Sequence, residues 1–384
     1  MKRGYILSRI ALLAVAAAFA ASCAPVGPPP EKQDNPPVKD PVGAIGIGPP
    51  RADLLQQRIK EAIAQVDRRK LQWNHGFWTV FHAILGMGPK HTTLSDKAKE
   101  RVNALKYISE GGEMRGLQGT LVPTDDGIDV LSPKDQIFYA QGHQDQFVAE
   151  MVQWGLRLDY PFVVQGKKYT FKDFVNFSKV RARLTDKQEL SWAILIIGEH
   201  FGTDYSWTNR YGEKLTFADV VRYEVHEPIE DAACGGTHRL FGLTWVLHRH
   251  LERGGKVEGV WKDVVARIER YKRRAREVRI ADGSFSTAFF KEREDAPDVN
   301  RRTNTTGHIV EWLALAMTDA ELREPWMQEA VSALTKLLLD NSGAAIDGGS
   351  LYHAVHGLLI YSARVYGPEI LGDMAPVVPL PPRK

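Results

Sequence analysis

Several features that define common protein classes are scarce or absent in this chain. Its 384 residues include two cysteines, Cys23 and Cys234. Since Cys23 is expected to carry a lipid, Cys234 has no partner for an intrachain disulfide, and stability has to come from a packed core. A formal net charge of +3, spread along the chain, predicts no nucleic-acid partner. The one basic run, residues 270–279, is interpreted as a solvated helix face.

Familiar catalytic motifs are also lacking. The sequence has no nucleophile elbow, no phosphate-binding loop and no dinucleotide fingerprint. Strand signals are scarce, the best being residues 161–171, where a small hairpin is expected. Beyond the N-terminal leader, no stretch is apolar over the roughly 18 residues that would suggest a membrane span. The remaining sequence therefore favours a mostly helical domain.

The N-terminus is typical of an exported bacterial protein. Lys2 and Arg3 precede an apolar run that ends in Ala-Ala-Ser-Cys at residues 20–23. We interpret residues 1–22 as a signal peptide. The four residues ending in Cys23 resemble a lipobox, which implies lipidation of Cys23, with ordinary cleavage nearby as the alternative. The prediction is a periplasmic or outer-membrane or cell-surface lipoprotein that meets the membrane through a lipid anchor only.

Proline-rich segments bound the folded part of the chain. Nine prolines lie among residues 24–50, so residues 23–50 are expected to be a lipidated cysteine and an extended tether. A second proline cluster predicts a tail over residues 371–384. These limits leave one domain over residues 51–370.

Apolar and amphipathic stretches alternate along this domain. The apolar stretches are expected to begin near six residues: His75, His143, Trp192, His238, His308 and His353. Amphipathic, more charged stretches lie between them, at residues 52–70, 97–109, 171–184, 216–225, 258–276 and 321–339. A helical pair that cannot bury its own apolar face must stack on its neighbours. The predicted fold is therefore all-α, an (α/α)6 toroid of six helical hairpins with inner helices ringed by outer helices.

The lengths of the connections indicate one functional end. The long connections, at 110–142, 226–237, 277–305 and 340–351, all precede an inner helix. In such a toroid the N-termini of the inner helices lie at one end, where long loops and helix dipoles favour a site.

The alternation, the motif Ala-Asp-Gly-Ser-Phe-Ser-Thr at 281–287 and Asp-Ala-Ala-Cys-Gly-Gly at 231–236 resemble the terpenoid cyclase and protein prenyltransferase toroid superfamily. The resemblance covers the domain as architecture. Its prenyltransferases bind zinc through Asp-x-Cys and a later histidine, which implies Asp231 and Cys234 with His308 or His353. Here the spacing is Asp-x-x-Cys, and the cyclases' Asp-rich and Gln/Trp motifs are absent.

Histidines and acids at the inner-helix starts are the candidate catalytic groups, because imidazole changes charge near neutral pH and paired carboxylates can divide acid and base roles. The set comprises His75, His143, Asp145, Glu230, Asp231, His238, Arg239, His308, Glu311 and His353. For each of them, a hydrogen-bonded or packed structural role is the alternative. Such acid/base chemistry requires no cofactor.

A metal site is a second interpretation of the same residues. His353 and His356 are three apart and share a helix face, as two ligands of one ion require. The candidate ligands are Asp231, Cys234, His308, His353 and His356, and the ion that they suit is Zn²⁺.

Three functions follow from these patterns. The first is an exported hydrolase or lyase, a glycoside hydrolase or polysaccharide lyase, with a funnel of histidines and acids that acts on a polysaccharide or glycan. The second is a non-catalytic toroid that binds an envelope ligand or partner, with the 277–305 loop as its recognition surface. The third is a metal-dependent, prenyltransferase-like site.

Overall fold

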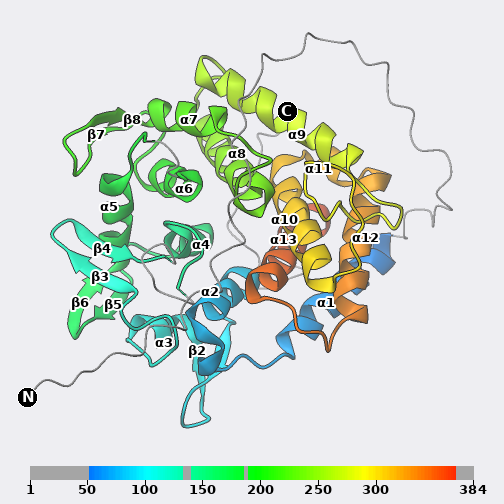
Figure 1. The fold of residues 1–384 in the computed structure, drawn as a ribbon, viewed down its shortest axis with the longest axis horizontal. Coiled ribbons are helices and arrows are strands. Elements are labelled where there is room, and N and C mark those ends of the chain that lie inside the picture. The colour runs from blue at the N-terminus through cyan, green and yellow to red at the C-terminus, as the bar shows by residue number, and fades with distance from the viewer. Residues whose placement is uncertain (1–51, 133–139, 186–188, 369–384) are drawn as a thin grey trace, which may run out of the picture. The chain divides into compact units, whose positions relative to one another are not determined.

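The structure is a computed structural model that describes residues 52–368, except 133–139 and 186–188 (Figure 1). The predicted signal peptide, the predicted lipidation at Cys23, the tether over 23–50 and the tail over 371–384 lie outside these residues. Within the described part, thirteen α-helices and four small two-stranded antiparallel sheets are present. The chain is therefore mostly helical, as predicted. None of the described helices is long and apolar enough to cross a bilayer.

Six of the helices correspond to the apolar stretches. They are α2 (Gly76–Met87), α4 (Gln146–Gln153), α6 (Ser191–His200), α8 (Thr237–Glu252), α10 (Val299–Ala316) and α13 (Gly348–Tyr366). Each contacts the next in this order, and α13 also contacts α2. Helices α10 and α13 pack along each other most extensively, as Figure 1 shows. The apolar residues of these six helices belong to one hydrophobic core, which they share with the other helices and with the hairpins.

The amphipathic stretches form a second set of helices. These are α1 (Ala52–Asp67), α3 (Ala104–Ser109), α5 (Phe171–Arg181), α7 (Phe217–His226), α9 (Val260–Glu277), a short α11 (Asp319–Leu322) and α12 (Pro325–Asp340). Their buried residues face the first set, as in the contacts of α1 with α13, α5 with α6, α9 with α8 and α12 with α10. The predicted helix over 97–109 is wrong in its first half, which holds a strand.

Four hairpins decorate the helices. The expected hairpin is present as β5 (Pro161–Val164) paired with β6 (Lys167–Thr170). Three further hairpins were not predicted: β1 (Thr93–Ser95) with β2 (Arg101–Asn103), β3 (Leu121–Thr124) with β4 (Gly127–Val130), and β7 (Ser206–Thr208) with β8 (Lys214–Thr216). Their strands are three or four residues long, too short for an alternating pattern to stand out in the sequence.

Helix α10 begins earlier than expected. Its N-cap is Asp298, whose side chain accepts a hydrogen bond from the backbone N–H of Arg301. The polar first turns, through Thr306, resemble a loop in composition, and the prediction that the helix begins near His308 is therefore wrong. His308 lies in the interior of α10, and the preceding connection is correspondingly shorter than 277–305.

Candidate functional site

Seven ionisable side chains from five of the apolar helices and the turns before them gather in the interior. We call them the histidine cluster: His82, His143, Glu150, Cys234, His238, His308 and His353. They form three overlapping groups of three, and within each group the potential ligand atoms lie within 4.8 Å of one another. His308 and His353 have ring centroids 4.1 Å apart, and His238 lies 5.1 and 5.3 Å from them. These described residues could hold a metal ion.

The group of His238, His308 and His353 consists of histidines alone, and all three are buried. Each of the three side chains is at most 2% exposed. Nδ1 of His308 lies 2.7 Å from the carbonyl oxygen of Asn304, and Nδ1 of His353 lies 2.8 Å from Oε2 of Glu311. Their Nε2 atoms have no hydrogen-bond partner among the described residues. Histidines that bind metals are typically held in this way, by a carbonyl or carboxylate on the other ring nitrogen.

Glu311 orients two histidines at once. Its second oxygen, Oε1, lies 2.7 Å from Nδ1 of His356, whose Nε2 also lacks a partner among the described residues. The predicted pair His353 and His356 therefore shares a carboxylate. Burial opposes ionisation of Glu311, but the two histidines outweigh it and hold the pKa of Glu311 well below its usual range.

His238 differs from its neighbours because neither of its ring nitrogens has a hydrogen-bond partner among the described residues. It belongs both to the group with His308 and His353 and to the group with His143 and Cys234. The indole of Trp192 packs on its ring at 4.7 Å between centroids. A buried imidazole without partners loses the hydrogen bonds that it makes in water, at a cost of about 1–3 kcal/mol. The site therefore contains buried polar atoms without hydrogen-bond partners among the described residues, which points to a ligand.

The protonation states of two of the three histidines suit metal binding, whereas the pKa of His308 is raised because Cys234 and Glu311 outweigh its burial. Burial lowers the pKa of His353 to about 4, despite the carboxylate of Glu311. Burial and the charges of neighbouring histidines also hold the pKa of His238 well below 6.5. Both imidazoles are therefore neutral at pH 7, as a metal ligand must be.

His143 and Cys234 form a more accessible edge of the cluster, because both are partly exposed. Nδ1 of His143 lies 2.9 Å from Oε2 of Glu189. Burial would lower the pKa of His143, but the carboxylate of Glu189 and the thiolate of Cys234 raise it to about 10. Burial likewise opposes ionisation of Cys234, but His308 and His143 lower the pKa of this thiol to about 6. These two shifts favour a Cys234 thiolate beside a His143 imidazolium.

The turn before α8 positions Cys234 through an unusual backbone. Cys234, Gly235 and Gly236 all have positive φ angles, of 48°, 60° and 73°. A Cβ on Gly235 would come within 2.2 Å of the ring of Phe289, and one on Gly236 within 2.5 Å of the carbonyl of Ile229. Glycine is therefore required at both positions.

Three functional residues were missed at the sequence level. His82 lies on α2 with Nδ1 at 2.7 Å from the carbonyl of Trp78, and its Nε2 is 3.5 Å from Oε1 of Glu150. Glu150 is fully buried, and both of its oxygens lack a hydrogen-bond partner among the described residues. Burial and the charge of Glu311 raise its pKa well above the usual range. Polar residues inside the apolar stretches of α2 and α4 were the available signal, and Glu189 had none.

Several predicted site residues lie apart from the cluster. Asp231, a candidate ligand, is 80% exposed and forms an ion pair with Lys291 at 2.9 Å. Glu230 accepts a hydrogen bond from the hydroxyl of Tyr271. The structure thus gives these two carboxylates separate partners, and neither belongs to a group of described residues that could bind a metal.

Asp145 and Arg239 have structural partners. Asp145, in the left-handed conformation at the N-cap of α4, pairs with Arg181 at 2.5 Å and accepts from the hydroxyl of Ser178. Arg239 pairs with the buried Glu224 at 2.8 Å. Glu224 also accepts a hydrogen bond from the backbone N–H of Leu190 and so anchors the start of α6. The alternative structural role fits both residues.

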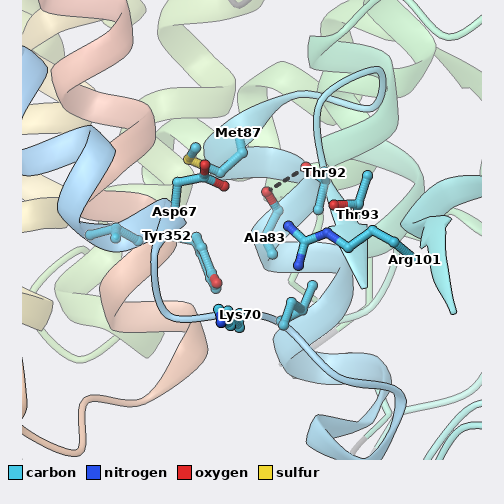
Figure 2. Close-up of a pocket in the computed structure, with 10 residues that line it drawn as sticks. Asp67, Lys70, Ala83, Met87, Thr92, Thr93, Arg101 and Tyr352 are labelled. Atoms are coloured by element: carbon cyan, nitrogen blue, oxygen red, sulfur yellow. Dashed lines mark hydrogen bonds between the residues drawn. The ribbon is translucent and has the colours of Figure 1, made fainter. Parts of the chain in front are cut away.

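His75 lies in a pocket away from the cluster. It is exposed at the N-cap of α2 and lines a pocket of about 470 Å³ together with Asp347, Arg69 and Tyr352. Figure 2 shows a smaller neighbouring pocket, into which Asp67, Lys70, Arg101 and Tyr352 project. Beside it, the hydroxyl of Thr92 donates to the carbonyl of Ala83. Neither pocket is lined by a member of the histidine cluster.

Comparison with known proteins does not supply a function. No protein-family model, no curated protein and no solved structure matches the chain. Function therefore has to be inferred from the geometry of the histidine cluster.

Proposed function

We propose that this protein is a metal-dependent enzyme that binds one Zn²⁺ ion through Nε2 of His308, Nε2 of His353 and a ring nitrogen of His238. The proposal is supported above all by three buried imidazoles whose ligand atoms lie within 4.8 Å and carry no other partner among the described residues. A bound ion would give each of the three nitrogens the partner that it lacks. Without it, their burial is an uncompensated cost.

The proposed scaffold is an (α/α)6 toroid. The proposal is supported by the cyclic order of contacts among α2, α4, α6, α8, α10 and α13, in which the last helix returns to the first. The histidine cluster draws its members from α2, α4, α8, α10, α13 and the turns before α4 and α8. Side chains that project inward from a ring of helices converge on its axis, which explains why residues so distant in sequence meet.

The donor set favours zinc with one open position. Imidazole suits Zn²⁺, and three protein ligands with a free fourth place are typical of catalytic rather than structural zinc. When bound, the ion would act as a Lewis acid toward a substrate oxygen. The chain's own groups hold the site: Glu311 orients His353, and the carbonyl of Asn304 orients His308. The partly exposed edge at His143 and Cys234 gives access to the solvent side.

For the reaction we propose hydrolysis or elimination on a glycan, following the export and lipid anchoring expected at Cys23. Glu150 supports acid/base chemistry, since its raised pKa keeps the carboxyl protonated beside His82. A zinc-loaded protein should release new reducing ends or unsaturated products from one member of a panel of uronic-acid and neutral glycans. Failure across the panel would leave the metal site intact and remove the substrate class.

The metal content of the purified full chain tests the proposal directly. We expect about one zinc ion per chain, bound with an affinity that falls at least about 100-fold in His308→Ala and in His353→Ala. Glu311→Gln, which keeps the shape but removes the charge behind His353, should lower the affinity about 10- to 100-fold.

A matched control separates this site from adventitious binding. His91 is an exposed histidine outside the cluster, and His91→Ala should bind zinc as the wild type does. Equal zinc binding by wild type and His308→Ala, or a folded wild type that takes up no zinc, would overturn the proposal.

A further inference from the structure

A second chemical group lies beside the proposed metal site. Cys234, His143 and Glu189 come from the turn before α8, the turn before α4 and the segment before α6. We propose that they form a nucleophilic acyl-transfer site, in which the thiolate of Cys234 attacks the carbonyl carbon of an ester or thioester with an apolar acyl group. This inference does not rest on the proposed zinc site.

The arrangement has the order that an activated thiol requires. A ring nitrogen of His143 lies within 4.8 Å of the sulfur of Cys234. Nδ1 of His143 is held by Glu189 at 2.9 Å, which leaves Nε2 to exchange a proton with the thiol. A nucleophile, a base within reach and a third group that orients the base are the parts of a catalytic triad. His143 and Glu189 are 12% and 24% exposed, so substrate can approach from this side.

A second, independent observation points to a ligand here. His238 shares the group with Cys234 and His143, is 2% exposed, and has no hydrogen-bond partner at either ring nitrogen among the described residues. A polar atom of a bound substrate would satisfy one of these nitrogens. The positive end of the α8 dipole also lies at Cys234 and favours negative charge on its sulfur and on a nearby carbonyl oxygen.

The surroundings indicate the acyl group. The ring of Phe289 packs so closely on Gly235 that no Cβ fits between them. Phe289 is partly buried, and it also contacts the ring of His308 at 6.3 Å between centroids. The ring of Trp192 packs on His238, which belongs to the same group as Cys234. Two aromatic rings on direct neighbours of the thiol favour a hydrocarbon chain over a charged or sugar group at the acyl position.

The proposed step balances as follows. In the resting pair His143 already holds the proton of Cys234, so the thiolate forms a bond between sulfur and the carbonyl carbon, and the carbonyl electron pair moves onto oxygen. Its return breaks the bond to the leaving alcohol or thiol, which receives the proton from His143. Water then attacks the thioester, giving its proton to His143, and the carboxylic acid and the thiol of Cys234 are released. Glu189 is a positioning residue in this scheme.

The test uses the full chain carrying Cys23→Ser, so that Cys234 is the one thiol in the sequence. With p-nitrophenyl hexanoate as the probe and a chelator present, we expect a burst of about one p-nitrophenolate per chain and a hexanoyl adduct on Cys234. His143→Ala should slow the burst at least about 100-fold. Glu189→Gln should slow it less, and Glu189→Asp should restore part of the rate. His91→Ala is the matched control and should react as the parent does.

Alkylation of Cys234 by iodoacetamide provides a second measurement for any variant whose burst is lost. Folded His143→Ala, checked by circular dichroism, should alkylate more slowly than the parent. No adduct on Cys234, or a burst and an alkylation rate unchanged in His143→Ala, would overturn the inference.

Zinc distinguishes this inference from the proposed function. If one equivalent of zinc abolishes alkylation in the parent and alkylation without zinc is independent of His143, Cys234 is a metal ligand and the acyl-transfer site is rejected. A His143-dependent burst without any zinc binding would reject the zinc site alone. Zinc binding without a burst would reject the acyl-transfer site alone.

Discussion

Helix α8 has a buried histidine near each end, and the two histidines differ in their hydrogen bonding. At the C-terminal end, Nδ1 of His250 lies 3.0 Å from the hydroxyl of Thr203, and Nε2 lies 3.0 Å from the carbonyl of Lys256. Its ring stacks on Trp261 at 4.0 Å with an angle of 12° between planes. At the N-terminal end, His238 is equally buried but has no hydrogen-bond partner among the described residues.

This difference separates a structural histidine from a functional one. Buried polar groups in folded proteins are almost always hydrogen-bonded, so an exception requires an explanation. His250 closes a turn and needs nothing further. His238 lies among the six other side chains of the histidine cluster, which converge from separate helices and turns, and a bound ion or substrate would supply the missing partner. The same residue type on one helix thus serves two purposes, and the hydrogen-bond inventory tells them apart.

The largest expected effect on stability concerns Arg239, the residue after His238, whose charge is paired with Glu224. Arg239→Ala leaves the carboxylate of Glu224 buried and uncompensated at the start of α6. Because breaking a buried pair from one side typically costs about 3–5 kcal/mol, we expect a loss of that size in the free energy of unfolding. Urea denaturation measures it. Glu224→Gln with Arg239→Met, which removes both charges, should recover much of the loss, and no recovery would mean that the pair is not the cause.

Zinc should stabilise the folded protein through His238, at the N-terminal end of α8, and this gain should not depend on His250 at the other end. At 100 times the dissociation constant, a ligand that binds only the folded state adds about 2.7 kcal/mol to the free energy of unfolding. We expect this gain, measured by thermal denaturation with and without chelator, in the wild type and in His250→Ala. It should disappear in His238→Ala. An equal gain in His238→Ala would place the ion elsewhere.

Replacing each histidine in the absence of metal compares how much each one contributes to the free energy of unfolding. His250→Ala leaves the hydroxyl of Thr203 and the carbonyl of Lys256 without their partner, which costs about 1–3 kcal/mol beyond the lost packing. His238→Ala removes two unsatisfied nitrogens and should cost less than His250→Ala does. Denaturation of both variants in chelator decides the order, and the reverse order would mean that His238 has a partner in the free protein.

The smallest effect is expected at Asp231, a ligand candidate at the sequence level. Its ion pair with Lys291 is exposed, and such pairs contribute less than about 1 kcal/mol. Asp231→Asn should therefore bind zinc like the wild type in a titration and unfold at nearly the same urea concentration. A large fall in the zinc affinity of Asp231→Asn would mean that Asp231 is a metal ligand after all.

The helical periodicity was readable in the sequence because it is local. Apolar runs such as that of α13 and charged runs such as that of α9 identify the two sets of helices directly. Helix α10 shows the limit of the method. Its first turns are polar, and the Asp298 cap together with tertiary packing, above all against α13, stabilises them as helix. Three of the short hairpins were not predicted because strands of three or four residues are too short to show an alternating pattern.

Residue type alone pointed to part of the site. Histidines near the apolar stretches were recognisable, and His143, Cys234, His238, His308 and His353 do meet. Asp231 and Glu230 were chosen by proximity in sequence to Cys234, but Asp231 pairs with Lys291 and Glu230 accepts a hydrogen bond from Tyr271 instead. Glu189 and Glu150 could not be selected, because a carboxylate becomes notable only when its surroundings are known.

The sequence by itself determined the mostly helical character of the chain, the separation of apolar from amphipathic helices and the supply of histidines near the apolar ones. Tertiary structure alone decided which of those histidines share a site and which are hydrogen-bonded to neighbours. The physical reason is range. Helix formation and amphipathicity depend on residues three or four positions apart, whereas a ligand set depends on atoms a few ångströms apart whose residues, such as His82 and His353, are separated by most of the domain.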